Sequence, residues 1–312
     1  MSSIALCIPA YQAESYLPRL LDSANKQVIP FSEIWVYDDA SLDNTAEVAR
    51  SYGAKVLQGD VNRGCSFGKN ALLEQVQSDW IHYHDADDEL LPNFTSLARD
   101  WIMKPDCPDV VLFDYVYRDN QTNELISSSD FKPEELERDP LRYAILHQIN
   151  PFCGLYRRSS LLRVGGYDVD PLILYNEDVA FHIKLASLGL SFSAEKEVSI
   201  INYRMPGSMS GSNQLKCLLA HVEVMRRISI KTDRFYSREI KFKLWRAAQG
   251  LASMTEWAHV DQALGIASRV SPVLPSGISP LFAALVRIFG DRLAFRFREY
   301  GIRLFKPHLR KP

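Results

Sequence analysis

Short apolar runs alternate with amphipathic stretches over about the first 90 residues, and this alternation restricts the fold more than any other feature of the chain. The apolar runs predict short strands at Ile4–Ile8, Ile34–Tyr37, Ala54–Leu57 and Trp80–Tyr83. Helices are expected between them, over Glu14–Lys26, from a cap at Asp43 or Asn44, and over about Ser66–Gln77. Strands that alternate with helices in this order are typical of an open, mostly parallel α/β sheet.

Three polar loops follow the predicted strands, at the carboxyl ends where such sheets bind ligands. They are Pro9–Tyr11, Asp38–Asp39 and Asp85–Asp88. No G-x-G-x-x-G follows the first strand, and no G-x-x-x-x-G-K-[ST] is present, so dinucleotide and P-loop sites are disfavoured. A nucleotide site at this edge therefore has to use carboxylates and a metal.

The third loop is the most acidic, because Asp85, Asp87 and Asp88 come directly after a buried strand. Burying such carboxylates is costly unless a cation or hydrogen bonds compensate. Alternate residues of an extended segment point the same way, so Asp85 and Asp87 can converge on one metal diphosphate. The pattern predicts Mn²⁺ or Mg²⁺, which prefer oxygen ligands. The alternative is a solvated acidic turn that caps the helix expected near Pro92.

The composition is that of an ordinary globular protein: 46% hydrophobic and 24% charged among 312 residues. A net charge of −2 gives no reason to expect binding to nucleic acid. The five cysteines form no C-x-x-C pair, which argues against zinc and disulfides and suits a reducing compartment. Neither a signal peptide nor a run of 18 apolar residues is seen, so a cytoplasmic location is expected.

Several segments, in their order and spacing, resemble glycosyltransferase family 2, whose fold is called GT-A. They are Ile8–Gln12, Val36–Thr45, Asn62–Gly64 with Lys69–Asn70, Asp85–Asp87, Arg157–Ser159, Gly165–Tyr167, Asn176–Asp178, Tyr203–Arg204 and Ser208–Ser210. The resemblance covers roughly residues 3 to 212. It implies a Rossmann-like, mostly parallel sheet flanked by helices.

The resemblance also implies a donor site. Pro9, Ala10 and Tyr11 would contact the nucleotide base, and Asp39 would accept a hydrogen bond from a ring N–H of the base. Further residues with implied roles are Arg63 and Lys69 (nucleotide or phosphates, unless they are simply solvated), Asp85 (ribose and metal) and Asp87 (metal). Asp88 would be a reserve ligand or a helix cap.

Glu177 and Asp178 precede an amphipathic stretch, Val179–Leu188, where acids are favoured at a helix N-terminus. Capping is thus one interpretation. The family resemblance gives Asp178 the role of general base, which takes the proton of an acceptor hydroxyl as it attacks the anomeric carbon. One displacement with one base inverts the anomeric configuration. Glu177 would help to hold the acceptor.

The acceptor side is less well marked. Residues 114–151 are polar and look like an insertion, and the analogy places Phe152, Cys153 and Gly154 near the acceptor. Cys153 is expected to be a packing residue, since nothing nearby activates it as a nucleophile. Many relatives carry a histidine shortly after the Tyr-Arg pair, and it can join the metal site. None follows Tyr203–Arg204 here, so the sequence does not identify a third metal ligand. His82 and His84 are expected to pack or to face solvent.

The chain after about Ser212 changes to helical patterns, over Gln214–Lys231, Ser237–His259 and from Pro280 onward. We therefore expect a catalytic domain over residues 1–212 and a helical region over 213–312. Residues 281–312 carry eight Lys/Arg against two Asp/Glu. The apolar stripe there, from Phe282 to Leu304, either docks on protein or meets an anionic membrane surface.

Taken together, the sequence predicts a metal-dependent, inverting glycosyltransferase that uses a nucleotide-diphosphate sugar, with UDP as the default nucleotide. Its acceptor would be a surface polysaccharide, a lipid-linked glycan or a protein. The enzyme itself would be cytoplasmic, with peripheral contact to the inner face of the membrane as one option. The alternatives are a catalytically silent sugar-nucleotide or glycan-binding protein, and a nucleotidyltransferase, which would need a glycine-rich phosphate loop.

Overall fold

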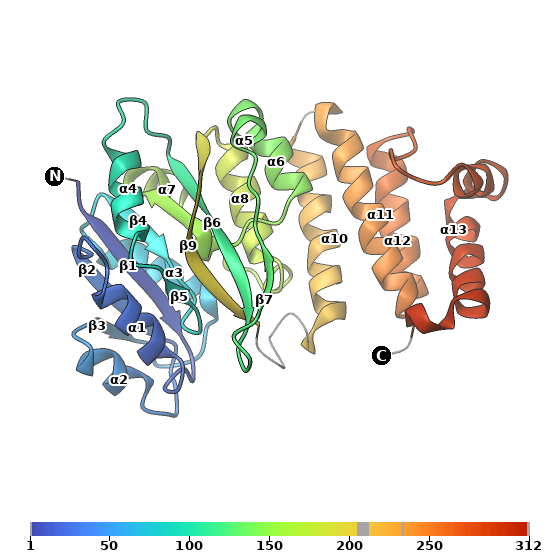
Figure 1. Ribbon diagram of the computed structural model, residues 1–312. Helices are drawn as coiled ribbons and strands as arrows, with labels where there is room; N and C mark the ends of the chain where they lie inside the picture. Colours follow the sequence, from blue (N-terminus) through green and yellow to red (C-terminus); the bar gives the residue numbers. More distant parts are fainter. Residues whose placement is uncertain (1, 205–211, 233, 311–312) are drawn as a thin grey trace. The chain divides into compact units, whose positions relative to one another are not determined.

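The computed structural model describes residues 2–204, 212–232 and 234–310 (Figure 1). The chain divides into two compact units, Met1–Asp170 with Ala180–Ser208, and Pro171–Val179 with Met209–Pro312. Each unit is considered by itself. The predicted family segment Ser208–Ser210 lies outside the described residues.

The first unit is built around one β-sheet in the described part of the chain. Its strands are β1 (Ile4–Ala10), β2 (Glu33–Asp38), β3 (Lys55–Gln58), β4 (Trp80–Tyr83), β5 (Glu89–Leu90), β6 (Val110–Asp119), β7 (Leu125–Ser128), β8 (Gly154–Arg157) and β9 (Phe192–Arg204). Their order is β3-β2-β1-β4-β8-β6-β9-β5, and β7 pairs with β6. The strands β3, β2, β1 and β4 are parallel, as are β6 and β9, while the other pairs are antiparallel.

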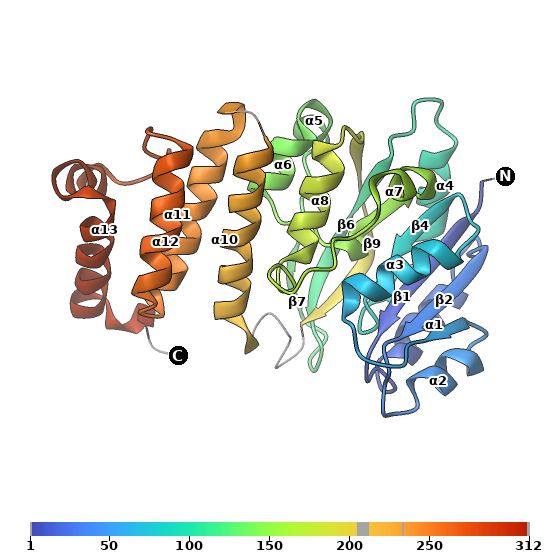
Figure 2. The same cartoon turned by 180° about the vertical axis from the view of Figure 1, so that it is seen from behind.

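Helices cover both faces of this sheet. They are α1 (Leu17–Asn25), α2 (Thr45–Ser51), α3 (Cys65–Gln75), α4 (Phe94–Ile102), α5 (Pro133–Arg138), α6 (Pro140–Leu146), α7 (Arg158–Val164) and α8 (Glu177–Ser187), with a 3-10 turn at Pro151–Cys153. The helices α1 and α3 lie on opposite faces (Figures 1 and 2). The mixed sheet with flanking helices confirms the predicted fold class, and its parallel part is the N-terminal half in which strands and helices alternate.

The predicted elements of this half agree with the structure to within three residues at either end, and β4 agrees at both ends. Asn44 precedes α2, but the side chain that bonds to the helix start is that of Asp43, whose Oδ1 accepts from the Thr45 backbone N–H at 3.1 Å. The alternation works because the apolar strand residues, such as Leu6, Val36 and Ile81, have no exposed surface.

Glu33 ties the start of β2 to the chain before β4. Its carboxylate accepts hydrogen bonds from the Trp35 indole at 2.8 Å, from the Gln77 and Ser78 backbone N–H groups, and from the Ser78 hydroxyl. Burial alone would raise the pKa of Glu33, but these hydrogen bonds outweigh it and lower the pKa to about 2. The charged carboxylate therefore stabilises the fold.

Stability should consequently fall in acid. Because the folded pKa is depressed, the contribution of Glu33 is present above the unfolded pKa of about 4.3 and is lost as the pH falls toward 2. Urea unfolding measures the free energy of unfolding at pH 7 and at pH 3. In Glu33→Gln, the difference between these two free energies should be about 2 kcal/mol smaller than in the wild type. An unchanged difference would show that Glu33 is protonated equally in both states.

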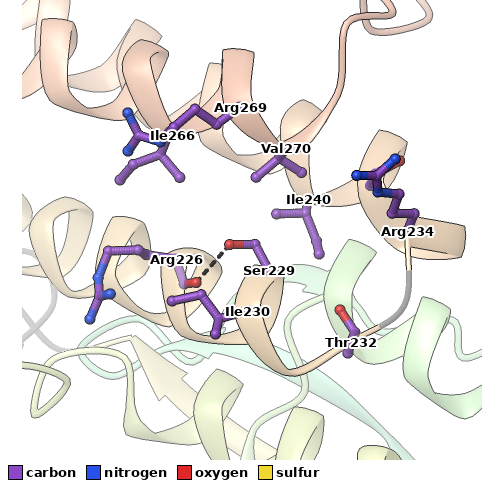
Figure 3. Close-up of a pocket in the computed structure, with 10 residues that line it drawn as sticks. Arg226, Ser229, Ile230, Thr232, Arg234, Ile240, Ile266, Arg269 and Val270 are labelled. Carbon is purple, nitrogen blue, oxygen red and sulfur yellow. Dashed lines mark hydrogen bonds between the residues drawn. The ribbon is translucent and has the colours of Figure 1, made fainter.

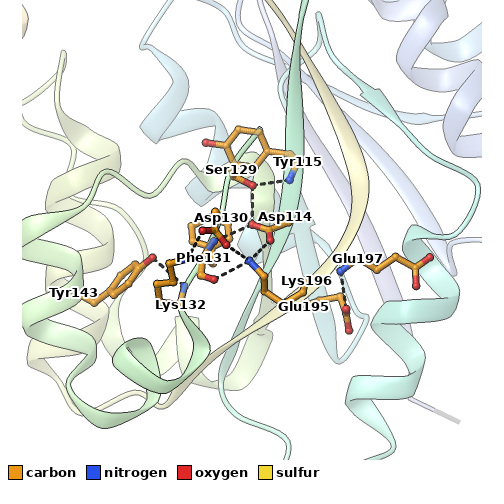
Figure 4. Close-up of polar contacts among 10 residues, drawn as sticks. All are labelled: Asp114, Tyr115, Ser129, Asp130, Phe131, Lys132, Tyr143, Glu195, Lys196 and Glu197. Atoms are coloured by element: carbon orange, nitrogen blue, oxygen red, sulfur yellow. Dashed lines mark hydrogen bonds and ion pairs between the residues drawn. The ribbon is translucent and has the colours of Figure 1, made fainter. Parts of the chain in front are cut away.

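A second polar cluster fastens the segment after β7 to β6 and β9 (Figure 4). Lys196 Nζ lies 2.5 Å from Asp114 Oδ2 and 2.6 Å from Asp130 Oδ1, and it donates to the Phe131 carbonyl at 2.9 Å. The other oxygen of Asp114 accepts from the Ser129 hydroxyl and from the Phe131 N–H. The segment that looked like a polar insertion is thus held to the sheet by one buried carboxylate.

Lys196→Met should leave the Asp114 carboxylate, which is 4% exposed, without its cation. The Ser129 and Phe131 hydrogen bonds remain, and half of the Lys196 side chain is open to water, so the expected loss of stability is about 2 kcal/mol. Denaturant unfolding measures it. The double variant Lys196→Met, Asp114→Asn should recover part of the loss, and a full additive loss would contradict this pairing.

The second unit is helical. Its helices are α10 (Gln214–Lys231), α11 (Ser237–Ser253), α12 (Trp257–Val270) and α13 (Pro280–Phe305). The predicted single helix over Ser237–His259 is wrong: the chain breaks between α11 and α12, where Thr255 has a φ of 63°. Gly290 interrupts α13 with a φ of 77°, whereas Gly301 remains helical.

The apolar stripe of α13 is divided between two environments. Phe282 packs against Trp245 and Phe295 with ring centroids 6.0 Å and 5.4 Å away. The remaining aromatic and leucine side chains of the stripe are 45–70% exposed; they are Phe289, Leu293, Phe297, Tyr300 and Leu304. Among the described residues, no helix combines the length and apolarity that crossing a bilayer requires.

Candidate active site

The polar loops predicted from the sequence meet at one edge of the sheet. The register pairs Ala10 with Asp38 and Cys7 with Tyr83, so β1, β2 and β4 end side by side. The Asp39 N–H donates to the Ala10 carbonyl at 2.9 Å, which joins the first two loops directly. Ala10 is buried, whereas Tyr11 is 49% exposed and can offer its ring to a ligand.

Asp39 holds the backbone before α3, a role that the sequence did not indicate. Its two oxygens accept the backbone N–H groups of Arg63 at 2.8 Å and Gly64 at 2.7 Å, just before α3. Each carboxylate oxygen has a further lone pair, so the side chain can still accept from a base. Asp38 instead forms a turn, accepting from the Ser41 N–H at 3.1 Å.

The two basic residues of the predicted donor site lie in different environments. Arg63 is exposed, and its guanidinium lies 4.6 Å from the centre of the Phe67 ring. Lys69 is only 2% exposed, so the solvated alternative is wrong for this residue. Its ammonium lies 5.0 Å from the Tyr167 ring centre and is close enough to Asp85 to oppose the rise in the pKa of that carboxyl.

The acidic loop is not a solvated turn. Asp85 and Asp87 are half-buried, and Asp88 is fully buried. Burial raises the pKa of Asp85, and burial with the charge of Asp85 raises the pKa of Asp87 to about 6. Burial and the charges of both neighbours raise the pKa of Asp88 well above its ordinary range. Three close carboxylates therefore repel one another here.

Asp88 bonds to β9 and does not cap the helix α4. Its oxygens accept from the Asn202 side-chain amide at 2.7 Å and from the Tyr203 N–H at 2.9 Å. It thereby fixes β9 to the acidic loop. In the described part of the chain, the carboxylates of Asp85 and Asp87 accept no hydrogen bond from another residue, so their oxygens are available to a cation.

This pair fits Mn²⁺ or Mg²⁺ in the chemistry of its donors. Both metals bind carboxylate oxygens together with phosphate oxygens and water, and neither needs a cage made of protein alone. Within residues 2–204, 212–232 and 234–310, no group of three or more His, Cys, Asp or Glu could hold a metal. His82 and His84 are buried, as expected for packing residues, and their rings hydrogen-bond to each other at 2.9 Å.

The candidate base lies at the start of α8, in the second unit. The residues before it are held by α10: His221 Nδ1 lies 3.0 Å from the Asn176 side-chain oxygen, and Lys216 donates to the Tyr175 hydroxyl at 3.2 Å. Burial and the charge of Lys243 lower the pKa of His221 to about 3, so the imidazole is neutral. No pattern in the amino-acid sequence indicates that α10 supports the Asn176–Asp178 segment.

The residues predicted for the acceptor side are buried. Phe152 is 3% exposed, Cys153 is 0% exposed, and Gly154 faces the Tyr156 ring. The Cys153 thiol donates to the Asn150 carbonyl at 2.8 Å, which agrees with its expected packing role. All five cysteines are described and none forms a disulfide. An acceptor role for these three residues stays a prediction.

A pocket of about 320 Å³ lies elsewhere, within the second unit (Figure 3). Its lining includes the apolar residues Ile230, Ile240, Ile266 and Val270 and the basic residues Arg226, Arg234 and Arg269. The Ser229 hydroxyl donates to the Arg226 carbonyl instead of facing the pocket as a donor. None of the predicted site residues lines it.

Comparison with known proteins agrees with the geometry of this site. Residues 5–165 match the sequence profile described as glycosyl transferase family 2. The chain belongs to this family. An uncharacterized glycosyltransferase of Rickettsia typhi is 26% identical over 182 residues, which make up 57% of each chain. The chain thus spans little more than half the length of that relative.

Solved structures share the fold. The protein TarS of Staphylococcus aureus, residues 1–349 in complex with UDP-GlcNAc, has a TM-score of 0.73 at 21% identity, with 97% of this chain and 92% of that chain covered. TarS is named a poly(ribitol-phosphate) beta-N-acetylglucosaminyltransferase. A mannosyltransferase of Pyrobaculum calidifontis in complex with GDP-Man and Mn²⁺ has a TM-score of 0.58 at 16% identity, with 97% and 87% covered.

Proposed function

We propose that the protein is a metal-dependent, inverting glycosyltransferase that moves a sugar from a UDP-sugar to an acceptor hydroxyl. One observation carries the proposal: the Asp85 and Asp87 carboxylates, which accept no hydrogen bond from another described residue, follow β4 at the edge where Asp39 and Tyr11 follow the adjacent parallel strands. Ligands of open α/β sheets bind at this edge. Family membership, shown by residues 5–165, supports the same class of reaction.

The chain's own residues supply binding and proton transfer. Asp39 and the Pro9–Tyr11 loop hold the nucleotide base of the donor, while Lys69 and Arg63 face its phosphates. Mn²⁺ or Mg²⁺, held by Asp87 and Asp85, would offset charge on the leaving diphosphate. Asp178 accepts the proton of the attacking hydroxyl, and Glu177 helps to hold the acceptor. A transition state like an oxocarbenium ion and a single displacement give inversion.

The donor is tested by thermal unfolding with UDP, GDP, dTDP and CDP, each with and without Mn²⁺. A ligand that binds the native state raises the melting temperature by mass action. The expected result is a shift with UDP that requires Mn²⁺, in line with the nucleotide in the TarS complex. A shift with another nucleotide would replace UDP, and no shift with any of them would contradict the donor site.

We also propose that α13 contacts an anionic membrane surface, where a lipid-linked or surface glycan acceptor would be found. The exposed apolar residues Leu293, Phe297 and Leu304 support this, as do the eight Lys/Arg of residues 281–312. Co-sedimentation should occur with phosphatidylglycerol vesicles and not with phosphatidylcholine vesicles, and Phe297→Ser should weaken it. Absence of binding to either would favour a protein partner for this stripe.

A further inference from the structure

Arg19, on the first turn of α1, reaches the acidic loop from outside the residues that the sequence singled out. Its Nη2 donates to the backbone carbonyl of Asp87, and its Nη1 donates to the Asn120 side-chain oxygen at 2.9 Å. The guanidinium carbon lies over the Tyr203 ring, 3.8 Å from the ring centre. One side chain thus joins α1, the acidic loop, the β6–β7 turn and β9.

The acidic loop is held on its other side through Asp88 and Glu89. Asp88 accepts from the Tyr203 N–H at 2.9 Å, and Glu89 accepts from the Tyr203 hydroxyl at 2.8 Å. Tyr203 therefore lies between the guanidinium and the two acids. These contacts fix the backbone on both sides of Asp87, while the carboxylate of Asp87 accepts no hydrogen bond from any other described residue.

We propose that Arg19 is a positioning residue of the donor site, which holds the Asp87 backbone so that the Asp85 and Asp87 carboxylates face one metal and diphosphate. This inference rests on the proposed function. An arginine suits the task because its planar fork can donate to a carbonyl and an amide at once while its face stacks on a ring. A lysine would keep the charge but lose the fork.

The test compares the wild-type protein with Arg19→Met and Arg19→Lys. Calorimetry measures the affinity for UDP with and without Mn²⁺, and electron spin resonance of free Mn²⁺ measures metal binding directly. Both variants should bind Mn²⁺–UDP about ten-fold more weakly, because misplaced supporting contacts of a metal site typically cost 10–100-fold in affinity. Binding of UDP without metal should change little. Arg50→Met is the matched control, since Arg50 bonds to Gln58 and Glu47 on α2 and β3.

A role in stability alone would lower the melting temperature and leave the Mn²⁺–UDP affinity of the folded protein at the wild-type value, and that result would overturn the proposal. Should Arg19→Met fail to fold, Asn120→Ala removes one partner of the guanidinium and is expected to weaken Mn²⁺–UDP binding by a smaller factor. Unchanged affinity in Asn120→Ala and Arg19→Lys would likewise overturn it. Absence of Mn²⁺-dependent UDP binding in the wild type would instead contradict the proposed function.

Discussion

Asp87→Asn should abolish most metal-dependent binding of UDP while leaving the fold intact. The substitution keeps the shape of the side chain and removes a charge that burial and the charge of Asp85 disfavour. We expect Mn²⁺–UDP affinity to fall about 100-fold and turnover of the donor by about 10³-fold, since metal and diphosphate charges are no longer neutralised. Because the repulsion from Asp85 also disappears, stability should be unchanged or slightly higher.

The neighbouring carboxylate provides the control. Asp88 bonds to Asn202 and to the Tyr203 N–H, so Asp88→Asn should lower the melting temperature and change Mn²⁺–UDP affinity much less. Calorimetric titration and thermal unfolding of both variants separate the two roles. A larger loss of metal affinity in Asp88→Asn than in Asp87→Asn would show that the ligands have been assigned the wrong way round.

The pattern of alternating strands and helices predicted the N-terminal half of the sheet because burial there is nearly complete. Cys7, Val36 and Ile81 have no exposed surface, so each buried strand appears in the sequence as a run of apolar residues. The strands β5 and β7 escaped prediction because neither contains a buried apolar run of this kind. All four residues of β7 are exposed, and β5 has two residues, too few for any periodicity to show.

The donor residues could be predicted individually, but their partners could not. Asp85 and Asp87 stand out in the sequence because carboxylates after a buried strand need an explanation. Arg19 is 68 residues from Asp87, and Tyr203 is 115 residues from Asp88. Contacts over such separations follow from the order of the strands, which brings β9 beside β5. His221 and Asn176, which are 45 residues apart, meet through the packing of α10 against the segment before α8.

The helical region shows where local patterns mislead. The apolar periodicity continues through Leu251, Met254 and Ala258, so Ser237–His259 reads as one helix. Thr255 takes a left-handed backbone conformation, which is uncommon for a β-branched residue, and no local signal marks it. Packing of α12 against α11 buries Leu251 and Val260 completely, and this gain outweighs the local preference of the backbone.

Asp178→Asn separates chemistry from binding and therefore tests the proposed reaction most directly. An amide cannot accept the proton of the attacking hydroxyl, and a general base contributes about 10²–10⁴-fold to rate. We expect turnover of the donor, measured as UDP release with Mn²⁺, to fall by about 10³-fold, with the affinity for Mn²⁺–UDP unchanged. Glu177→Gln should reduce turnover less, because the proposed role of Glu177 is to hold the acceptor.

The two outcomes of this comparison differ in what they say about the protein as a whole. Loss of turnover with full UDP affinity requires a reaction that depends on this carboxylate, and so excludes a silent sugar-nucleotide binder. Equal turnover in the wild type and in Asp178→Asn would return Glu177 and Asp178 to the role of acids at a helix N-terminus, where the helix dipole favours them. The supporting contact between His221 and Asn176 would then serve the fold of the second unit alone.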